Sequence, residues 1–164
     1  MVIQMKVYGL TVDPFTNAPI VILKDMDNQN TLPIWIGVLE ASAIATELEK
    51  IQPTRPMTHD LLKSILDKIK LAVSRIVVTD LKDNVYYATI YMISDNCEYE
   101  IDARPSDAIA VALRSNSPIF VDKEVFEKSK RMLFKYDASN PNESNKWEEI
   151  LDNLSPEDFG KYKM

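Results

Sequence analysis

The side chain best suited to move a proton near neutral pH is His59, the only histidine in the chain. An imidazole acts as a general acid or base and also ligates metal ions. Thr58, just before it, has the residue type of a helix N-cap. Asp60, just after it, is a first-turn carboxylate that a helix dipole stabilises without any further role. Composition alone therefore favours a structural role for His59 and leaves its chemistry open.

A second polar group follows a predicted strand, where Arg104 and Asp107 begin a helix. Side chains three residues apart share one helix face, and Val111 and Arg114 continue it. A charged stripe at a helix start is a usual place to bind an anion or orient a substrate. An ion pair that only locks the helix start explains an isolated Arg–Asp pair equally well, and is the more common case.

Three carboxylates, Glu98, Glu100 and Asp102, alternate along the strand before that helix. Such a face could hold Mg²⁺ or Mn²⁺ through oxygen ligands. A solvated strand face has the same pattern and is the more common explanation. Glu40 and Glu47 share a face of an earlier helix, where either a ligand position or plain exposure accounts for them.

The composition limits which partners the chain can have. The formal net charge is −6, and the acidic excess persists when residues 134–164 are left out. Proteins that grip duplex nucleic acid through its phosphates usually carry a basic patch, so tight binding of RNA or DNA is disfavoured. The three glycines, Gly9, Gly37 and Gly160, lie too far apart for a phosphate-cradling loop, so neither a nucleotide nor a flavin cofactor is expected.

The chain also lacks the marks of a membrane or secreted protein. No apolar run approaches the roughly 20 residues that span a bilayer, and no signal-peptide pattern opens the sequence. The single cysteine, Cys97, can form neither an internal disulfide nor a cysteine-rich metal site. These features predict a cytoplasmic protein without a membrane partner.

The elements that must position these residues can be read from periodicity and turn composition. Strands are expected at 4–10, 19–24, 32–36, 73–81, 85–93, 97–102 and 118–121, and helices at 38–51, 58–69, 104–115 and 123–132. The pattern predicts an α+β fold, with a mixed, largely antiparallel sheet of hairpins and a meander packed with several helices. Pro33 cannot donate to a ladder, which places its strand at an edge of the sheet.

Two helices have apolar stripes that predict their buried sides. The first stripe comprises Ala41, Ile44, Leu48 and Ile51, with Ala43 on another face. The second comprises Leu61, Leu62, Ile65, Leu66 and Ile69. Composition shifts after Leu133, so residues 1–133 are expected to form the domain. Residues 134–164 are expected to be a polar linker and a short helical tail around Trp147 and residues 155–158.

Four segments, in this order and spacing, resemble the bifunctional nuclease family. They are residues 32–37 (LPIWIG) with Glu40 and Ala41, residues 55–62 (RPMTHDLL), residues 80–88 (DLKDNVYYA) and residues 102–110 (DARPSDAIA). The resemblance covers about residues 3–133. It implies an α+β fold, cleavage of RNA and DNA with little sequence preference, and a homo-oligomer.

The resemblance also suggests a phosphodiesterase site. His59, Asp60, Arg104 and Asp107 would be catalytic, with His59 as general acid or base and Arg104 as a phosphate clamp. Glu40, Thr58, Asp102 and Ser106 would support them. Asp102, Asp107 and Glu40 are the candidate ligands for Mg²⁺ or Mn²⁺. The alternative is a non-catalytic binding or regulatory module that uses the same polar pocket for a small anion or a protein partner.

Overall fold

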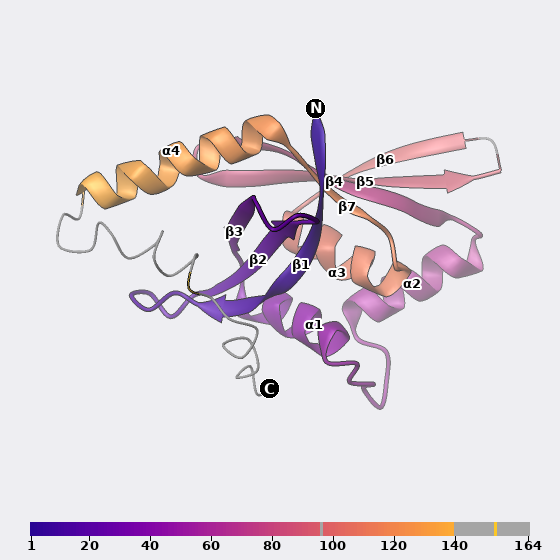
Figure 1. The fold of residues 1–164 in the computed structure, drawn as a ribbon. Helices are drawn as coiled ribbons and strands as arrows, with labels where there is room; N and C mark the ends of the chain where they lie inside the picture. Colours follow the sequence, from indigo (N-terminus) through magenta and orange to yellow (C-terminus); the bar gives the residue numbers. More distant parts are fainter. Residues whose placement is uncertain (96, 140–152, 154–164) are drawn as a thin grey trace.

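The chain folds around one mixed sheet (Figure 1). The computed structural model describes residues 1–95, 97–139 and 153, and these contain seven strands and four helices. The strands are β1 (Val2–Val12), β2 (Pro19–Asp25), β3 (Thr31–Trp35), β4 (Ala72–Lys82), β5 (Val85–Ser94), β6 (Cys97–Ala103) and β7 (Ile119–Asp122). The helices are α1 (Val38–Leu48), α2 (Thr58–Lys68), α3 (Pro105–Ser115) and α4 (Lys123–Ser139).

The sheet has the strand order β3-β2-β1-β7-β4-β5-β6. Neighbouring strands run antiparallel except β4 and β7, which pair in parallel. This confirms the α+β fold with a mixed, largely antiparallel sheet. The parallel pair arises because the chain leaves the β4–β6 meander through α3 and returns as β7 between β1 and β4.

Turn chemistry fixes the hairpins as the sequence predicts. Asp83 and Asn84, which join β4 to β5, both have positive φ angles, 50° and 62°. A two-residue turn of this kind matches the right-handed twist of its strands, and Asp and Asn tolerate the conformation. In the second Asp-Asn turn, Asp95 also has a positive φ of 48°, while Asn96 lies outside the described residues.

The sheet curls so that its two ends approach one another. Pro33 lies in β3, which is an edge strand as predicted. The Tyr86 hydroxyl at the start of β5 donates to the Pro33 carbonyl oxygen of β3 at 3.3 Å, although four strands separate β3 from β5 in the sheet order. The same hydroxyl lies 3.0 Å from Ser129 Oγ of α4. Tyr86 therefore closes a seam between β3, β5 and α4.

Helix α1 is buried more widely and ends earlier than its apolar stripe predicts. Ala41 and Ile44 are buried as expected, but Ala43 is buried too. The reason is that α1 packs against both β2 and α3. Leu48 and Ile51 are exposed, so their predicted burial is wrong. The helix ends at Leu48, and Lys50 then adopts a positive φ of 55°, which turns the chain away from the core.

Helix α2 differs most from its prediction. Of the five residues expected to face inward, Leu66 is buried, whereas Leu61, Leu62, Ile65 and Ile69 are exposed. The stripe has helical spacing, but α2 touches the body chiefly along α3, so one side chain reaches the core. An apolar face is left on the surface.

The last described helix is longer than predicted. Helix α4 continues to Ser139 instead of ending at Met132, so residues 134–139, which were assigned to the linker, are helical. The rest of the expected linker and the expected tail helices near Trp147 and residues 155–158 lie outside the described residues. In the part of the chain that the structure describes, no helix is long and apolar enough to cross a membrane.

Candidate functional site

Two polar residues far apart in the sequence meet between α2 and α3. His59 Nε2 lies 2.9 Å from Asp107 Oδ1. His59 is in the first turn of α2 and Asp107 in the first turn of α3, and these helices pack together. The packing of α2 against α3 therefore holds the N-termini of the two helices side by side. A carboxylate bonded to one imidazole nitrogen fixes the ring and its tautomer, which leaves the other nitrogen to exchange protons.

Arg104 bridges this pair to α1. Its Nε donates to Asp107 Oδ2 at 2.7 Å, and its Nη1 lies 2.7 Å from Glu40 Oε1. The side chain is 67% exposed, and within the described residues Nη2 has no hydrogen-bond or ion-pair partner. Gly37 makes room for the arrangement, since a Cβ at that position would collide with the Glu40 carboxylate. His59, Asp107, Arg104 and Glu40 form one connected group, called the Arg104 cluster below.

The hydrogen bonds that Asp107 accepts keep it ionised. Burial alone would raise the pKa of Asp107, but the hydrogen bonds from Arg104 and His59 outweigh that effect and lower its pKa below the ordinary value of 3.8. The carboxylate is therefore charged across the neutral range. In that state it can orient His59 and stabilise an imidazolium.

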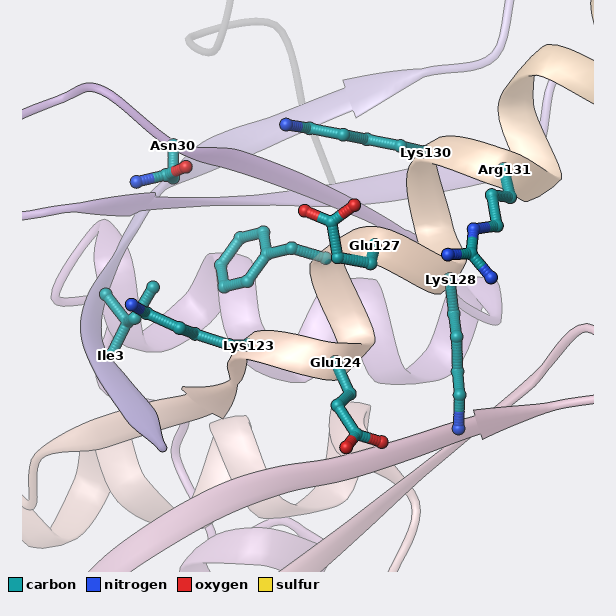
Figure 2. Close-up of a pocket in the computed structure, with 9 residues that line it drawn as sticks. Ile3, Asn30, Lys123, Glu124, Glu127, Lys128, Lys130 and Arg131 are labelled. Carbon is teal, nitrogen blue, oxygen red and sulfur yellow. The ribbon is translucent and has the colours of Figure 1, made fainter.

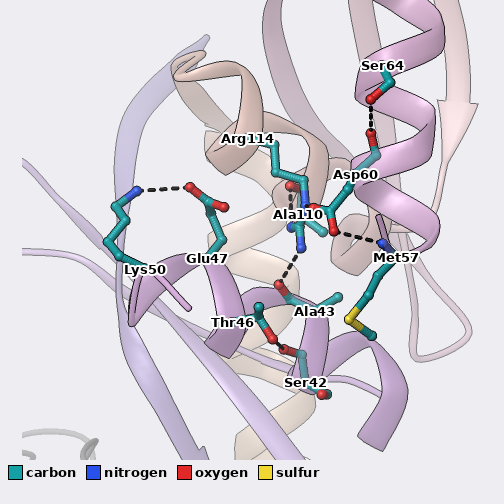
Figure 3. A network of polar contacts seen from close by, with 10 residues as sticks. All are labelled: Ser42, Ala43, Thr46, Glu47, Lys50, Met57, Asp60, Ser64, Ala110 and Arg114. Carbon is teal, nitrogen blue, oxygen red and sulfur yellow. Dashed lines mark hydrogen bonds and ion pairs between the residues drawn. The ribbon is translucent and has the colours of Figure 1, made fainter. Parts of the chain in front are cut away.

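Asp60 belongs to a neighbouring network and not to the Arg104 cluster (Figure 3). Its Oδ1 pairs with Arg114 Nε, and its Oδ2 accepts the Met57 backbone N–H at 2.9 Å. Arg114 also donates to the carbonyl oxygens of Ala110 and Ala43, each at 3.0 Å. Burial opposes ionisation of Asp60, but Arg114 and the Met57 N–H hold its pKa below the ordinary value. These contacts tie α1, α2 and α3 together.

The remaining predicted residues have separate places. Thr58 is not the N-cap of α2, because Met57 occupies that position and Asp60 caps the helix by accepting its backbone N–H. Ser106 is 6% exposed and follows Arg104 in α3. Asp102 lies on β6, and no hydrogen bond or ion pair links it to the Arg104 cluster within the described residues.

The Arg104 cluster does not fit a divalent metal ion. Both oxygens of Asp107 are engaged, one by His59 and one by Arg104, and one oxygen of Glu40 contacts the same guanidinium. The described ranges also contain no group of three His, Cys, Asp or Glu side chains placed to hold a metal. Glu98, Glu100 and Asp102 are exposed on β6, an edge strand, where charge hinders pairing with another sheet.

Cavities adjoin the two networks on different sides. Arg104 and Ser106 line a cavity of about 330 Å³, together with Trp35 and Tyr86. Asp60 and Glu47 line another, of about 290 Å³, beside the connector from α1 to α2. Arg104 and Asp60 thus face different openings.

A wider cavity, of about 570 Å³, lies along α4 (Figure 2), and no predicted site residue lines it. Lys123, Lys130 and Arg131 are interspersed there with Glu124 and Glu127. The mixed charges give it no defined ligand chemistry. In Figure 1, α4 lies above β1, β2 and β3, and α1, α2 and α3 lie below β4, β5 and β6.

Sequence reasoning did not find the Asp60–Arg114 pair, whose members lie 54 positions apart. The available signal was the position of Arg114 on the same α3 stripe as Arg104 and Asp107. The packing of α2 on α3 was needed to select its partner. Three tyrosines of β5 have local contacts. Tyr86 is hydrogen-bonded, and the rings of Tyr87 and Tyr91 lie beneath Lys82 and Arg75.

Comparison with known proteins identifies relatives over most of the chain. Residues 21–133 match the family model described as the bifunctional nuclease domain. This region includes every residue of the Arg104 cluster. An uncharacterised protein of Mycobacterium tuberculosis is 33% identical over 162 residues, which cover 95% of this chain and 97% of that protein.

Plant proteins match a shorter region. A protein named bifunctional nuclease 1 of Oryza sativa is 28% identical over 109 residues, which cover 64% of this chain and 33% of the plant protein. A protein named bifunctional nuclease 2 of Arabidopsis thaliana is 30% identical over 107 residues, which cover 63% of this chain and 32% of that plant protein. The shared part is thus about a third of each plant protein.

Proposed function

Because this chain belongs to the bifunctional nuclease domain family, we propose that it hydrolyses phosphodiester bonds of RNA and DNA with low sequence preference. The observation that carries the proposal is the 2.9 Å contact between His59 Nε2 and Asp107 Oδ1, with Arg104 on the other Asp107 oxygen. The names of the plant relatives support the same activity.

His59 would act as the proton-transfer group. With its Nε2 proton directed at Asp107, Nδ1 is a proton acceptor that makes no hydrogen bond within the described residues. It would accept the proton of an attacking water as the new O–P bond forms. The same proton would then pass to the leaving oxygen as the ester P–O bond breaks.

Arg104 would supply a hydrogen-bond donor for the phosphate. Its exposed guanidinium keeps Nη2 available, so it can donate to a phosphoryl oxygen while Nε and Nη1 remain on Asp107 and Glu40. Donors fixed in this way stabilise negative charge that develops in the transition state without reorganising. Since the cluster does not fit a metal ion, no step is assigned to one.

The test uses the purified full chain with labelled single-stranded RNA and DNA at low salt. His59→Ala and Asp107→Ala should each lower cleavage at least about 100-fold, the usual size of a general acid–base contribution. Asp67→Asn is the matched control, since Asp67 is a carboxylate of the same helix as His59 that pairs with Lys63 on the surface. Thermal unfolding of each variant checks the fold.

A double variant, His59→Ala with Asp107→Ala, measures contaminating nuclease. Parallel reactions with Mg²⁺, with Mn²⁺ and with a chelator measure the ion dependence that the sequence predicts. Full cleavage by both single variants would overturn the assignment of this site.

The second candidate is a non-catalytic binding module, and one observation favours it. Arg104 is already neutralised by two carboxylates, and Asp60 and Arg114 neutralise one another. The polar residues thereby hold three helices together without a substrate. Binding of RNA or DNA by the wild-type chain with no turnover above the double variant would support this function in place of hydrolysis.

A further inference from the structure

Two adjoining cavities form a groove that ends at the Arg104 cluster. They share Trp35, Asn84 and Tyr86 as lining residues. One, of about 300 Å³, extends to Met132 and Leu133 of α4, and the other, of about 330 Å³, extends to Arg104 and Ser106. We call the two together the Trp35 groove. It overlies the seam where Tyr86 joins β3 to α4.

The middle of the groove is aromatic and rigid. Trp35 Nε1 donates to Asp13 Oδ2 at 2.9 Å, and the ring packs on the buried pair Ile20 and Ile22. Asp13 in turn accepts the backbone N–H groups of Phe15 and Thr16, which fixes the carboxylate. A ring held in this way is a stacking platform for a planar ligand. Asn84 adds an amide beside it, at the exposed tip of the β4–β5 hairpin.

The end at Arg104 has the groups that an anion needs. Arg104 is exposed there, and Ser106 lines the cavity in the first turn of α3. Ser106 is only 6% exposed, yet its side chain makes no hydrogen bond within the described residues. Its hydroxyl opens onto the cavity and is placed to donate to a ligand oxygen. The helix start adds favourable partial charge for an anion.

Beside Trp35 the groove is also lined by the Asp13 carboxylate, which would repel a second phosphate. The groove therefore suits one phosphate next to one planar ring, and not a run of phosphates. A base paired within a duplex cannot enter a groove of this kind without being unstacked.

We propose that the Trp35 groove binds one unpaired nucleotide of single-stranded nucleic acid, with the base against Trp35 and the phosphate at Arg104 and Ser106. This rests on the proposed function, because it takes nucleic acid as the substrate. It deepens that function by selecting single strands over duplexes. Asp107, which both Arg104 and His59 contact, would link the bound phosphate to the imidazole.

Binding can be followed by the fluorescence of Trp35 itself. The chain has two tryptophans, so Trp147→Phe leaves Trp35 as the reporter, and His59→Ala is added to prevent turnover. The probes are a short oligothymidylate, a blunt-ended duplex of two annealed strands and inorganic phosphate. Oligothymidylate should quench Trp35, whereas the duplex and phosphate should not. The logarithm of the binding constant should fall with the logarithm of salt with a slope of about −0.7, the value for one phosphate of a single strand.

Two serines of α3 provide a matched pair of variants. Ser106→Ala should weaken binding of oligothymidylate by about two- to tenfold, the value of one hydrogen bond. Ser115 has a hydroxyl without a hydrogen-bond partner in the described part of the chain, but that hydroxyl is buried and lies at the other end of α3. Ser115→Ala should leave binding unchanged.

Three results would overturn the proposal: no quenching by oligothymidylate, equal quenching by the duplex, or equal weakening by both serine variants. These outcomes are separate from the cleavage assay. Cleavage by the wild-type chain without Trp35 quenching would reject the groove and retain hydrolysis. Quenching without cleavage would reject hydrolysis and retain the groove as a single-strand site.

Discussion

Arg104 and Arg114 flank α3 at its opposite ends, and their surroundings predict opposite consequences of mutation. The Arg104 side chain is 67% exposed, and the Arg114 side chain is 4% exposed. Exposed ion pairs contribute little to stability because water screens them. Removing one partner of a buried pair is costly because the other charge and its hydrogen-bonding groups lose their partners.

We therefore expect Arg114→Ala to lower the free energy of unfolding by about 3 kcal/mol. Arg104→Ala should lower it by at most about 1 kcal/mol, while cleavage falls strongly. Urea unfolding of the two variants, followed by the cleavage assay on Arg104→Ala, measures both effects. A larger loss of stability in Arg104→Ala than in Arg114→Ala would contradict the burial argument.

A substitution at Arg104 can separate the role of the guanidinium geometry from the role of its positive charge. Arg104→Lys keeps the positive charge, but an ammonium is a point donor that lacks the fork of a guanidinium. It cannot hold Asp107 and Glu40 in the present geometry while donating to a phosphate. Cleavage by Arg104→Lys should therefore fall about as far as in Arg104→Ala. Recovery of wild-type kcat in the lysine variant would show that charge alone suffices.

Because of Asp60, the stability of the fold depends on pH in the acidic range. Its pKa in the folded chain lies below the ordinary value of 3.8, so folding favours the ionised form. The resulting stabilisation is complete above that ordinary value and is lost as the pH falls through the lower, folded-state pKa.

Asp60→Asn should thus be less stable than wild type near neutral pH, and its stability should fall less steeply between about pH 5 and about pH 3. Urea unfolding across that range measures the slope. Asp67→Asn, in the same helix, is the control and should keep the wild-type slope more closely. Identical slopes in wild type and Asp60→Asn would exclude this origin of acid sensitivity.

At the scale of elements, α2 is unusual because its apolar stripe faces outward. Leu66 is 7% exposed, whereas Leu62 and Ile65 are 40% and 48% exposed. Leu66→Ala should cost about 2–5 kcal/mol of unfolding free energy, as large-to-small changes in a core do. Leu62→Gln with Ile65→Gln should change it by less than about 1 kcal/mol in the isolated chain. Denaturant unfolding at low protein concentration compares the two.

For the whole molecule, the same face is where we propose that the predicted homo-oligomer forms. Leu62, Ile65 and Ile69 have the alternating three- and four-residue spacing of a helix–helix seam. Contiguous exposed apolar residues of this kind mark interaction surfaces. A second copy of α2 would cover them in a symmetric pair.

Sedimentation equilibrium of the wild type should then show a mass above 18.7 kDa, and Leu62→Gln with Ile65→Gln should reduce it to the monomer value. Leu61→Gln on the adjacent flank should weaken association less. A monomeric wild type would exclude the oligomer, and an oligomer unaffected by the double variant would exclude this face.

The sequence by itself determined the local structure of this protein. Strand alternation, the Asp83-Asn84 turn, the edge position of Pro33 and the start of α3 at Pro105 all depend on neighbouring residues, and all are present. Four motifs in register also identified the family and, through it, the residues His59, Arg104 and Asp107. Each of these inferences uses information contained within a few residues of the chain or in its linear spacing.

Tertiary packing decided the rest. Periodicity shows that α2 has an apolar face, but not whether the body covers it, so four of its five inward positions were wrong. Spacing along one helix paired Arg104 with Asp107, yet only the packing of α2 and α3 brought His59 to Asp107 and gave Asp60 to Arg114. The same packing leaves Asp102 outside the Arg104 cluster. Contacts between residues distant in the sequence depend on how whole elements pack, and that packing is set by the sum of many small interactions.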